Sequence, residues 1–532
     1  MNKQLVLGAE AIAMAALDEG ISCVYAYPGT PSTEITEYIQ RSSFAQKNKI
    51  HSSWSVNEKT AYESALGMSY AGKRSLVCMK HVGLNVAADA FMNSAITGIH
   101  GGLVIVVADD PSMHSSQNEQ DTRVYGKFSY LPLFEPSNQQ ETYNCVRDAF
   151  TFSEQVKLPV IVRITTRLSH SRSIVERKDA VAQNKLNPET DKKKWILLPA
   201  NARQQYANLL EIQQKLVDYS EASPLNKVIE GKGDKGIIAF GLAFNYVMEI
   251  ISEYDLDVPV LKISQYPLPE KLINDFYNRY DSILIAEEGY PVYEELLRGY
   301  FDNSKISGRL DNTLPRKGEL SPDAIAEALG IKREKQEEQA AINIPGRPPR
   351  LCDGCSHRDL YEALNKALID YDHKHVFSDI GCYTLGALPP FNAINTCVNM
   401  GASITMAIGA AEAGLLPAVA VIGDSTFTHS GITGLLDAVN YESPVTIIIS
   451  DNYTTAMTGG QDSSGTGRIQ KICQGIGVSE EHIKIIIPLK RNLDENISIL
   501  KKEFDYQGVS VILATRECIQ TLKRKKKKSN NA

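Results

Sequence analysis

Two patterns of apolar and polar positions alternate along this chain. Short apolar runs such as Leu103–Ala108 and Ala418–Ile422 are typical of strands in a parallel sheet, whose two faces are both covered. Between these runs lie stretches with helical spacing, several of which begin at residues that cap helices. The alternation predicts an α/β protein with parallel sheets covered by helices on both faces.

The expected elements fall into three α/β segments. In the first we expect helices over Gly8–Gly20, Thr33–Arg41 and Glu58–Ala71 and strands over Cys23–Tyr27, Leu76–Lys80, Leu103–Ala108 and Val160–Ile164. In the second we expect strands over Gly236–Phe240, Val258–Ile263 and Ser282–Ala286 and helices over Phe244–Glu253 and Glu270–Asn278. In the third we expect strands over His375–Ser378, Ala418–Ile422, Val445–Ser450 and Val509–Ala514.

The remaining segments differ in composition. Residues 186–230 are polar and rich in Lys and Gln, which favours a helical connector. Residues 331–350 are charged and then Pro-rich, which is typical of a linker. Residues 521–532 carry a Lys/Arg run, for which we expect a disordered basic tail. Folded domains are therefore expected over residues 1–185, 231–330 and 351–520.

Composition and charge exclude several classes of protein. The 532 residues are 43% hydrophobic and 22% charged, which is unlike a disordered, collagen-like or coiled-coil chain. A net charge of −7 argues against nucleic acid as the main partner. No apolar run reaches the roughly 20 residues of a membrane span. Nine scattered cysteines, and an N-terminus that lacks a cleavage site, favour a cytoplasmic protein in a reducing compartment.

The most specific chemical pattern lies at two strand ends of the third segment. Gly423, Asp424 and Ser425 follow one expected strand, and Asn452 and Thr454 follow the next. Because the carboxyl ends of adjacent parallel strands form a ligand crevice, these residues are candidates for one site. Glycine lets a phosphate approach the backbone, and Asp and Asn oxygens suit Mg²⁺. The alternative is that Asp424 and Asn452 are ordinary turn residues.

This pattern resembles the thiamine diphosphate motif, which begins Gly-Asp-Gly and ends in Asn at this separation; Ser425 replaces the third residue. The resemblance implies Mg²⁺ held by Asp424, Asn452 and the Thr454 carbonyl. The stretch that begins Asn57-Glu58-Lys59 resembles the helix whose carboxylate contacts the cofactor's aminopyrimidine ring. It implies that Glu58 activates the cofactor; the alternative is a surface Glu at a helix start.

Further motifs resemble the family of indolepyruvate ferredoxin oxidoreductase alpha subunits. They are Tyr27–Ser32, Met113–Asp121, Val160–His170, Leu351–Arg358, Asp379–Gly386 and Thr455–Gly459, within a similarity over about residues 5–520. The resemblance implies a pyrimidine-binding domain over 1–185, a transketolase-C-like domain over 231–330 and a diphosphate-binding domain over 351–520.

The same resemblance assigns further site residues. It implies that Thr30 lies at the substrate carbonyl or carboxylate, that His114 is catalytic, and that Gly381 and Cys382 face the diphosphate. A turn residue is the alternative for Thr30, and a polar loop is the alternative for His114.

Cysteine positions imply an electron path. In the related superfamily one [4Fe–4S] cluster lies near the cofactor, and Cys352, Cys355, Cys382 and Cys518 stand at the matching places. The alternatives are buried small side chains or a zinc pair. We expect the other five cysteines to be core residues: Cys23, Cys78, Cys145, Cys397 and Cys473.

Two departures from the family pattern stand out. The sequence contains none of the Cys-x-x-Cys-x-x-Cys runs of the family's C-terminal ferredoxin domain, so we expect electrons to leave through another chain or a carrier. Gly460 stands where the indolepyruvate type usually carries His, which leaves a branched or smaller 2-oxoacid as an alternative to an aryl pyruvate. The basic tail is expected to be a solvated end, with docking of ferredoxin or lipid as alternatives.

The resulting hypothesis is an anaerobic enzyme that oxidatively decarboxylates aryl pyruvates to acyl-CoA and passes the electrons to ferredoxin. Its expected cofactors are thiamine diphosphate, Mg²⁺ and one [4Fe–4S] cluster. We expect a homodimer of this chain in a heterotetramer with a smaller beta subunit. The rival hypotheses are a non-oxidative 2-oxoacid decarboxylase or ligase and a non-catalytic scaffold subunit.

Overall fold

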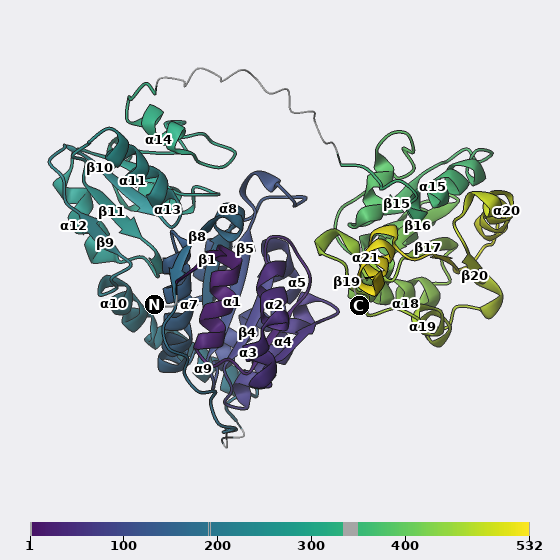
Figure 1. Cartoon of the computed structure of the whole chain (residues 1–532), viewed down its shortest axis with the longest axis horizontal. Coiled ribbons are helices and arrows are strands. Elements are labelled where there is room, and N and C mark those ends of the chain that lie inside the picture. The colour runs from purple at the N-terminus through teal and green to yellow at the C-terminus, as the bar shows by residue number, and fades with distance from the viewer. Residues whose placement is uncertain (1–2, 190, 192, 334–348, 531–532) are drawn as a thin grey trace. The chain divides into compact units, whose positions relative to one another are not determined.

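The computed structural model describes residues 3–189, 191, 193–333 and 349–530, in two compact units within residues 1–340 and 341–532 (Figure 1). Both units are built from parallel sheets with helices packed on them, which confirms the predicted α/β class. Most of the expected linker, residues 334–348, lies outside the described residues.

The first unit is organised around a seven-stranded sheet of order β12-β6-β7-β5-β4-β2-β3. All of its pairs are parallel except β12 with β6. The strands are β2 (Cys23–Ala26), β3 (His51–Trp54), β4 (Ser75–Lys80), β5 (Leu103–Asp109), β6 (Leu133–Phe134), β7 (Val160–Thr165) and β12 (Gln265–Tyr266). Every residue of β5 is buried, as its apolar sequence predicts for a central parallel strand.

Helices cover both faces of this sheet. Helix α1 packs on α2 and α7, and α4 packs on α5, which also contacts α6. The helices are α1 (Gly8–Asp18), α2 (Thr33–Arg41), α3 (Ser43–Lys47), α4 (Glu58–Tyr70), α5 (His81–Thr97), α6 (Thr122–Ser129), α7 (Gln139–Val156) and α8 (Thr166–His170). The antiparallel pair β1 (Lys3–Leu7) and β8 (Arg172–Glu176) lies beside α1.

A second sheet of the first unit has the order β14-β13-β10-β11-β9. Its strands are β9 (Lys227–Ile229), β10 (Lys235–Phe240), β11 (Val260–Ile263), β13 (Ser282–Ala286) and β14 (Ile306–Ser307). The helices around it are α11 (Ala243–Glu253), α12 (Glu270–Arg279), α13 (Val292–Tyr300) and α14 (Pro322–Ala328). Because β12 belongs to the first sheet, this region and the N-terminal region share one hydrophobic core.

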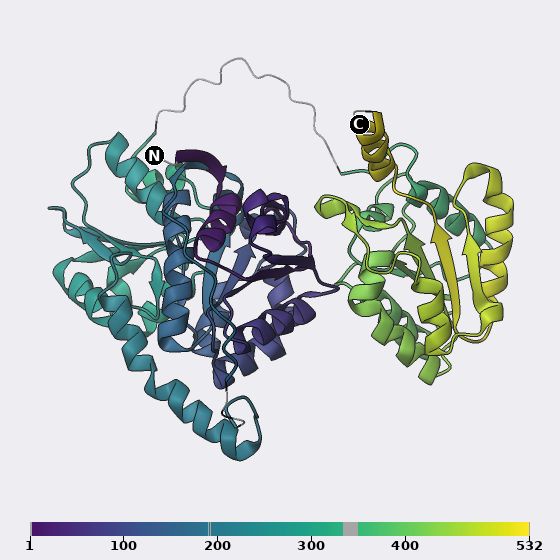
Figure 2. The ribbon, with the colours of Figure 1, turned by 60° about the horizontal axis from the view of Figure 1, so that its bottom comes forward.

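The expected helical connector contains α9 (Pro199–Glu211) and α10 (Gln213–Glu221), which run end to end along the outside of the unit (Figure 2). Leu209 and Leu216 are buried, so the helices are attached to the core through few apolar side chains. Strand β9 also falls inside residues 186–230 and pairs antiparallel with β11, so the connector ends in the second sheet.

The second unit has one parallel sheet of order β15-β16-β17-β21-β20. The strands are β15 (Val376–Ser378), β16 (Ala418–Gly423), β17 (Val445–Asp451), β20 (Ile483–Ile486) and β21 (Ser510–Thr515). Alternate residues of β16 face opposite cores: Ala420 and Ile422 pack in one, and Val419 and Val421 pack in the other. The fold is therefore three layers, with helices on both faces of the sheet.

The helices of the second unit divide between these two cores. The first core includes residues of α16 (Ala402–Glu412), α18 (Ile432–Asn440) and α19 (Ile469–Ile476), and the second includes residues of α15 (Ser356–Ala367) and α20 (Leu493–Phe504). The short helix α17 (Asp424–Thr426) follows β16 directly, and β18 (Thr454–Thr455) pairs with β19 (Gln461–Asp462) beyond the end of β17.

The basic C-terminal segment is helical, so the expectation of a disordered tail over 521–532 is wrong for its described part. Helix α21 spans Ile519–Asn530 and projects from the second unit (Figure 2). Lys, Arg and Leu favour helices, and the helix is tied to the unit by Gln520, which donates to Cys352 Sγ at 3.3 Å, and by Arg524, which donates to the Gly459 carbonyl.

None of the described helices combines the length and the apolar character that crossing a membrane requires.

Candidate functional site

The two strand ends singled out by the sequence are neighbours. Strands β16 and β17 pair in parallel up to Gly423 and Ser450, so Asp424 and Asp451 emerge at the same edge. Both carboxyls are buried, as is the Asn452 side chain. A buried cluster of two carboxyls and one carboxamide at the carboxyl ends of adjacent strands is a candidate cation and phosphate site.

The electrostatics of this edge favour a cation. Burial and the neighbouring Asp451 raise the pKa of Asp424 to about 7. Within the described residues, Asp424 Oδ2 is buried without a hydrogen-bond partner. A buried oxygen of this kind is costly unless something binds it, so the donor set fits a divalent cation held by one or two protein oxygens.

The loop after β17 is held close to the turn after β16. Thr454 N donates to Asn452 Oδ1 at 3.1 Å, and Thr455 Oγ1 lies 3.1 Å from Ser425 Oγ. Gly460 adopts a φ of +89°, and a Cβ placed there would lie 2.9 Å from Arg524 of α21. A side chain at position 460 would therefore displace the Arg524 guanidinium, and the positive φ would strain any residue other than glycine.

His357 contacts the site, although the sequence reasoning gave it no role. The ring is buried, Nδ1 lies 2.8 Å from Ser450 Oγ, and Nε2 lies 3.4 Å from Asn452 Nδ2. Burial lowers the pKa of His357 to about 4, so the ring is neutral. A neutral ring that donates from Nδ1 can accept at Nε2, which fixes the carboxamide nitrogen of Asn452 and leaves Oδ1 toward Thr454. In the sequence, the one indication of a role for His357 was its position two residues after Cys355.

Gly381 and Gly423 lie against the same aromatic ring. A Cβ at Gly423 would lie 2.6 Å from Tyr383 Cε1, and one at Gly381 would also overlap this ring. Tyr383 is buried, and Tyr361 OH donates to its carbonyl at 2.6 Å. Both glycines are therefore required by close packing around Tyr383.

The four cysteines assigned to a cluster lie near one another in the second unit. Burial raises the pKa of Cys382 to about 12, with added contributions from the charges of Cys355, Cys518 and Cys352. Cys355 N donates to the Cys352 carbonyl at 3.1 Å, and Cys518 N donates to the Asn452 carbonyl at 3.2 Å. Over the described ranges no group of three or more His, Cys, Asp or Glu is arranged to hold a metal ion.

Among the other five cysteines one prediction is wrong. Four are buried core residues as expected, but Cys397 is exposed and packs its sulfur 3.7 Å from the Asp379 carbonyl. It lies in the irregular segment between β15 and α16, which the apolar pattern did not resolve.

Glu58 begins α4 in the first unit. Asn57 caps the helix by accepting from Thr60 N at 2.9 Å, and Glu58 is only 5% exposed. Helix α5 passes close by, since a Cβ at Gly83 would lie 2.6 Å from Glu58 Oε1. The alternative of a surface glutamate is therefore wrong: this carboxyl is enclosed between two helices.

Thr30 and His114 lie on two loops that touch. Ser115 Oγ lies 3.4 Å from the Thr30 carbonyl, and the backbone of Ser115 is anchored by its N–H to Asp110 Oδ2 at 2.8 Å. The His114 side chain is 50% exposed and its Nε2 lies 3.0 Å from Glu319 Oε2. His114 is thus paired with a carboxylate at the surface.

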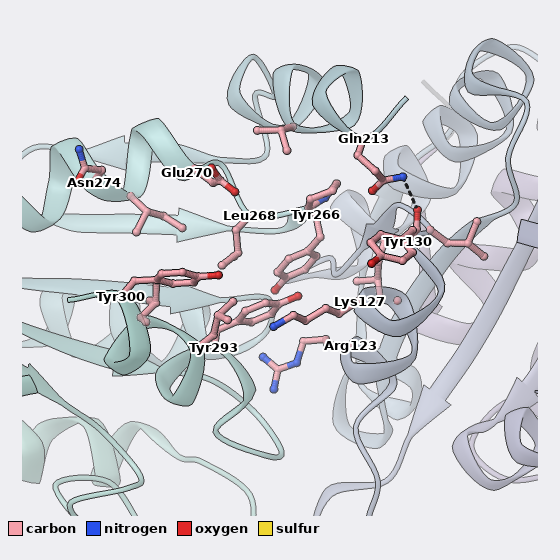
Figure 3. Close-up of a pocket in the computed structure, with 18 of the residues that line it drawn as sticks. Arg123, Lys127, Tyr130, Gln213, Tyr266, Leu268, Glu270, Asn274, Tyr293 and Tyr300 are labelled. Atoms are coloured by element: carbon pink, nitrogen blue, oxygen red, sulfur yellow. Dashed lines mark hydrogen bonds between the residues drawn. The ribbon is translucent and has the colours of Figure 1, made fainter. Parts of the chain in front are cut away.

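The first unit also contains an aromatic cavity of about 720 Å³ (Figure 3). Tyr266 and Tyr293 stack in it at 4.8 Å, and Arg123 lies under the Tyr293 ring. Its lining, from α6, α10, α12 and α13 and neighbouring segments, includes none of the residues that the sequence singled out. The cavity is therefore separate from the candidate chemistry.

Comparison with known families agrees with this geometry. Residues 14–222 match the family model "Pyruvate flavodoxin/ferredoxin oxidoreductase, thiamine diP-bdg". Residues 379–485 match the model "Thiamine pyrophosphate enzyme, C-terminal TPP binding domain". The second match includes both strand ends of the candidate site.

Curated relatives match nearly the whole chain. The indolepyruvate oxidoreductase subunit IorA of Archaeoglobus fulgidus is 39% identical over 97% of this chain and 86% of its own length. The subunit IorA of Pyrococcus horikoshii is 39% identical with the same coverage. A solved structure of 2-oxoglutarate:ferredoxin oxidoreductase from Magnetococcus marinus shares the fold, with a TM-score of 0.51, 16% identity, and 62% of this chain and 65% of that chain covered.

Proposed function

This chain belongs to the IorA family of thiamine diphosphate-dependent 2-oxoacid oxidoreductases, and we propose that it catalyses the oxidative decarboxylation of aryl pyruvates to acyl-CoA, with ferredoxin as electron acceptor. A smaller beta subunit is the expected partner, and a heterotetramer containing two copies of this chain is the expected assembly.

The observation that carries the proposal is the buried edge formed by Asp424, Asp451 and Asn452. Asp424 Oδ2 has no hydrogen-bond partner in the described part of the chain, which is what an oxygen reserved for a cation requires. We assign Mg²⁺ to Asp424, Asn452 and the Thr454 carbonyl, and the diphosphate to the turn at Gly423 and Ser425 and to Gly381 and Cys382. His357 positions Asn452 for this task.

Thiamine diphosphate, when bound, supplies a carbon nucleophile that attacks the 2-oxo carbon. Glu58 is the group we assign to the aminopyrimidine ring, because a carboxyl enclosed by α4 and α5 can hold a proton at a ring nitrogen without competition from water. Thr30 is assigned to the substrate's carbonyl or carboxylate group. His114 is kept as a candidate contact, with its imidazole oriented by Glu319.

Electrons are proposed to leave through a [4Fe–4S] cluster on Cys352, Cys355, Cys382 and Cys518. A four-iron cube is larger than one ion, so its sulfur ligands stand farther apart than those around a single metal. The four thiols influence one another electrostatically, which supports their proximity. Because Gly460 stands where the indolepyruvate type usually carries His, aryl, branched and small 2-oxoacids are the substrates to compare.

The test is an anaerobic assay of the chain with its beta subunit, thiamine diphosphate, Mg²⁺, CoA and ferredoxin. We expect 2-oxoacid-dependent ferredoxin reduction in the wild type and a loss of about 100-fold or more in Glu58→Gln, with an unchanged melting temperature. Iron and sulfide analysis separates the rival activity: aldehyde release by iron-free protein would identify a non-oxidative decarboxylase. Full activity in Glu58→Gln would contradict the proposed role of this residue.

A further inference from the structure

A lysine at the end of β4 stands among the residues assigned to catalysis in the first unit. Lys80 is the last residue of Ser75–Lys80, a strand that is otherwise buried, and α5 begins at the next position. Side chains at the carboxyl end of a parallel strand point into the ligand-binding edge of the sheet. The position is therefore one where a functional group is expected.

The stem of Lys80 lies against the Thr30 loop. A Cβ placed at Gly29 would lie 3.3 Å from Lys80 Cδ and 3.4 Å from Cγ, so this turn passes directly over the lysine side chain. The ammonium group donates to the Ser115 carbonyl at 3.1 Å, in the loop that follows His114. One ammonium thus lies between the two loops that carry Thr30 and His114.

The charge of Lys80 is only partly compensated. Asp110 and Glu58 are the carboxylates that act on it, and burial lowers the pKa of the ammonium. The Asp110 carboxylate is already occupied by Ser115 N at 2.8 Å, Ser116 Oγ at 2.7 Å and Thr166 Oγ1 at 2.6 Å. Within the described residues, Ser115 O is the hydrogen-bond acceptor found for Lys80, and no carboxylate is found at ion-pair distance.

A half-buried ammonium with donors to spare is a binding site for a small anion. This step rests on the proposed function: the anion that must reach this place is the carboxylate of the 2-oxoacid, since the turn before Thr30 contacts the lysine stem and the charge of Glu58 acts on the ammonium. We propose that Lys80 binds the substrate carboxylate and so selects 2-oxoacids over uncharged carbonyl compounds. The glycine at position 29 lets the turn lie close to the lysine stem, because a Cβ there would press on Lys80 Cδ and Cγ.

The test compares Lys80→Met with wild-type enzyme, both loaded with thiamine diphosphate and Mg²⁺ and paired with the beta subunit. We expect the Kd of phenylpyruvate, measured by calorimetry, and its KM to rise by about 10- to 100-fold, as is usual when a charged hydrogen bond is lost. The affinity for thiamine diphosphate and the binding of phenylpyruvamide, which lacks the carboxylate, should not change. Lys80→Arg should recover part of the affinity.

Lys59→Met is the matched control, because Lys59 follows Glu58 on the same helix but is exposed and paired with Glu63. It should bind phenylpyruvate as the wild type does. Equal Kd values for wild type and Lys80→Met would overturn the assignment of Lys80 while leaving the proposed function intact. Weakened cofactor binding in Lys80→Met would show that the lysine supports Glu58 instead. A wild type that binds no 2-oxoacid would remove both proposals together.

Discussion

Two glycines of the first unit, Gly83 and Gly67, differ in their distance from Glu58. Comparing alanine substitutions at the two positions tests whether the enclosed position of the Glu58 carboxyl matters. A Cβ at Gly83 would lie 2.6 Å from Glu58 Oε1, whereas a Cβ at Gly67 on α4 would meet nothing within 4 Å. Both glycines are helical, so an alanine at either position gains helix propensity. The two substitutions differ in their effect on the Glu58 carboxyl.

We therefore expect Gly83→Ala to lower turnover at least tenfold by displacing the carboxyl, with little change in the melting temperature. Gly67→Ala should keep full turnover and gain about 1 kcal/mol in unfolding free energy. Steady-state assays and thermal unfolding measure both effects. Normal turnover in Gly83→Ala would mean that the exact position of Glu58 is unimportant.

His357 gives a second test at the level of one side chain. Its Nε2 lies 3.4 Å from Asn452 Nδ2, so it orients a proposed metal ligand without touching the metal. We expect His357→Ala to weaken the binding of Mg²⁺ with thiamine diphosphate by about 10- to 100-fold, which is the usual cost of losing such support. Calorimetry measures the affinity, and circular dichroism checks the fold. An unchanged affinity would restrict His357 to a packing role.

At the level of elements, the ends of β16 and β17 bring two carboxyls together. The pKa of Asp424 is raised to about 7 by burial and by Asp451, so the metal-free site binds a proton below that pH. A cation must displace this proton. The apparent affinity for Mg²⁺ is therefore expected to fall up to about tenfold for each pH unit below 7 and to level off above it.

Calorimetry with thiamine diphosphate from about pH 5.5 to about pH 8, in two buffers of different ionisation enthalpy, checks this dependence. Proton release on binding should be largest at low pH and vanish above pH 7. Asp424→Asn should bind weakly at every pH. A flat affinity profile in the wild type would contradict a protonated Asp424 in the empty site.

The sequence predicted most of the elements that surround these sites. Ser282–Ala286 was predicted with its observed bounds, and β16 and β17 were predicted to within one residue, because buried parallel strands are continuous apolar runs. The short edge strand β12 was missed, since two residues carry no periodic signal and its partner lies far away in the sequence. Helix α21 was missed because a charge run was taken as evidence of disorder.

For the site residues too, the sequence predicted what depends on neighbouring segments and missed what depends on distant contacts. Asp424 and Asn452 were predicted because each directly follows an apolar strand, and the two strands are neighbours in the sequence with one helical stretch between them. Lys80 and His357 gave only local signals: a charge that ends an apolar strand, and a histidine after a cysteine pair. The contacts that give them a role, with Gly29 for Lys80 and with Asn452 for His357, depend on tertiary packing. Such contacts cannot be predicted from the local pattern of a single sequence.

For the whole chain, a buried network of charges joins the two sheets of the first unit. Arg163 pairs with Asp109, Asp121 and Glu135, and Arg123 pairs with Asp121 and Glu287. In the region of the first sheet, Asp109 lies in β5, Arg163 in β7, Asp121 and Arg123 at the start of α6, and Glu135 directly after β6. In the region of the second sheet, Glu287 directly follows β13. The regions predicted as separate domains, 1–185 and 231–330, are thus connected through both a shared core and this network.

Two buried carboxyls, Glu287 in this network and its neighbour Glu288, predict how the free energy of unfolding depends on pH. Burial raises the pKa of Glu287 and of Glu288 to about 7, from 4.5 in the unfolded chain. The folded chain therefore holds more protons than the unfolded chain between these values, and the free energy of unfolding falls as pH rises from about 4.5 to about 7. Above pH 7 these two groups add no further change.

Thermal unfolding of the full chain at a series of pH values measures this slope. Glu288→Gln should reduce it, because the amide oxygen can still accept from Leu320 N but no longer titrates. Glu270→Gln, on an exposed carboxyl, is the control and should leave the slope unchanged. A slope of the opposite sign would mean that other groups dominate the titration.

Asn452 is hydrogen-bonded on two sides to segments that contain Cys355 and Cys518. Its carboxamide is held by the imidazole two residues beyond Cys355, and its carbonyl receives the amide proton of Cys518. A displacement of Cys355 or Cys518 would therefore shift Asn452 directly, because each cysteine is at most two residues away from the group that hydrogen-bonds to Asn452. If the proposed cluster is bound there, an oxidant or a chelator that attacks its sulfur ligands should also weaken the binding of thiamine diphosphate, so that iron and cofactor are lost in parallel.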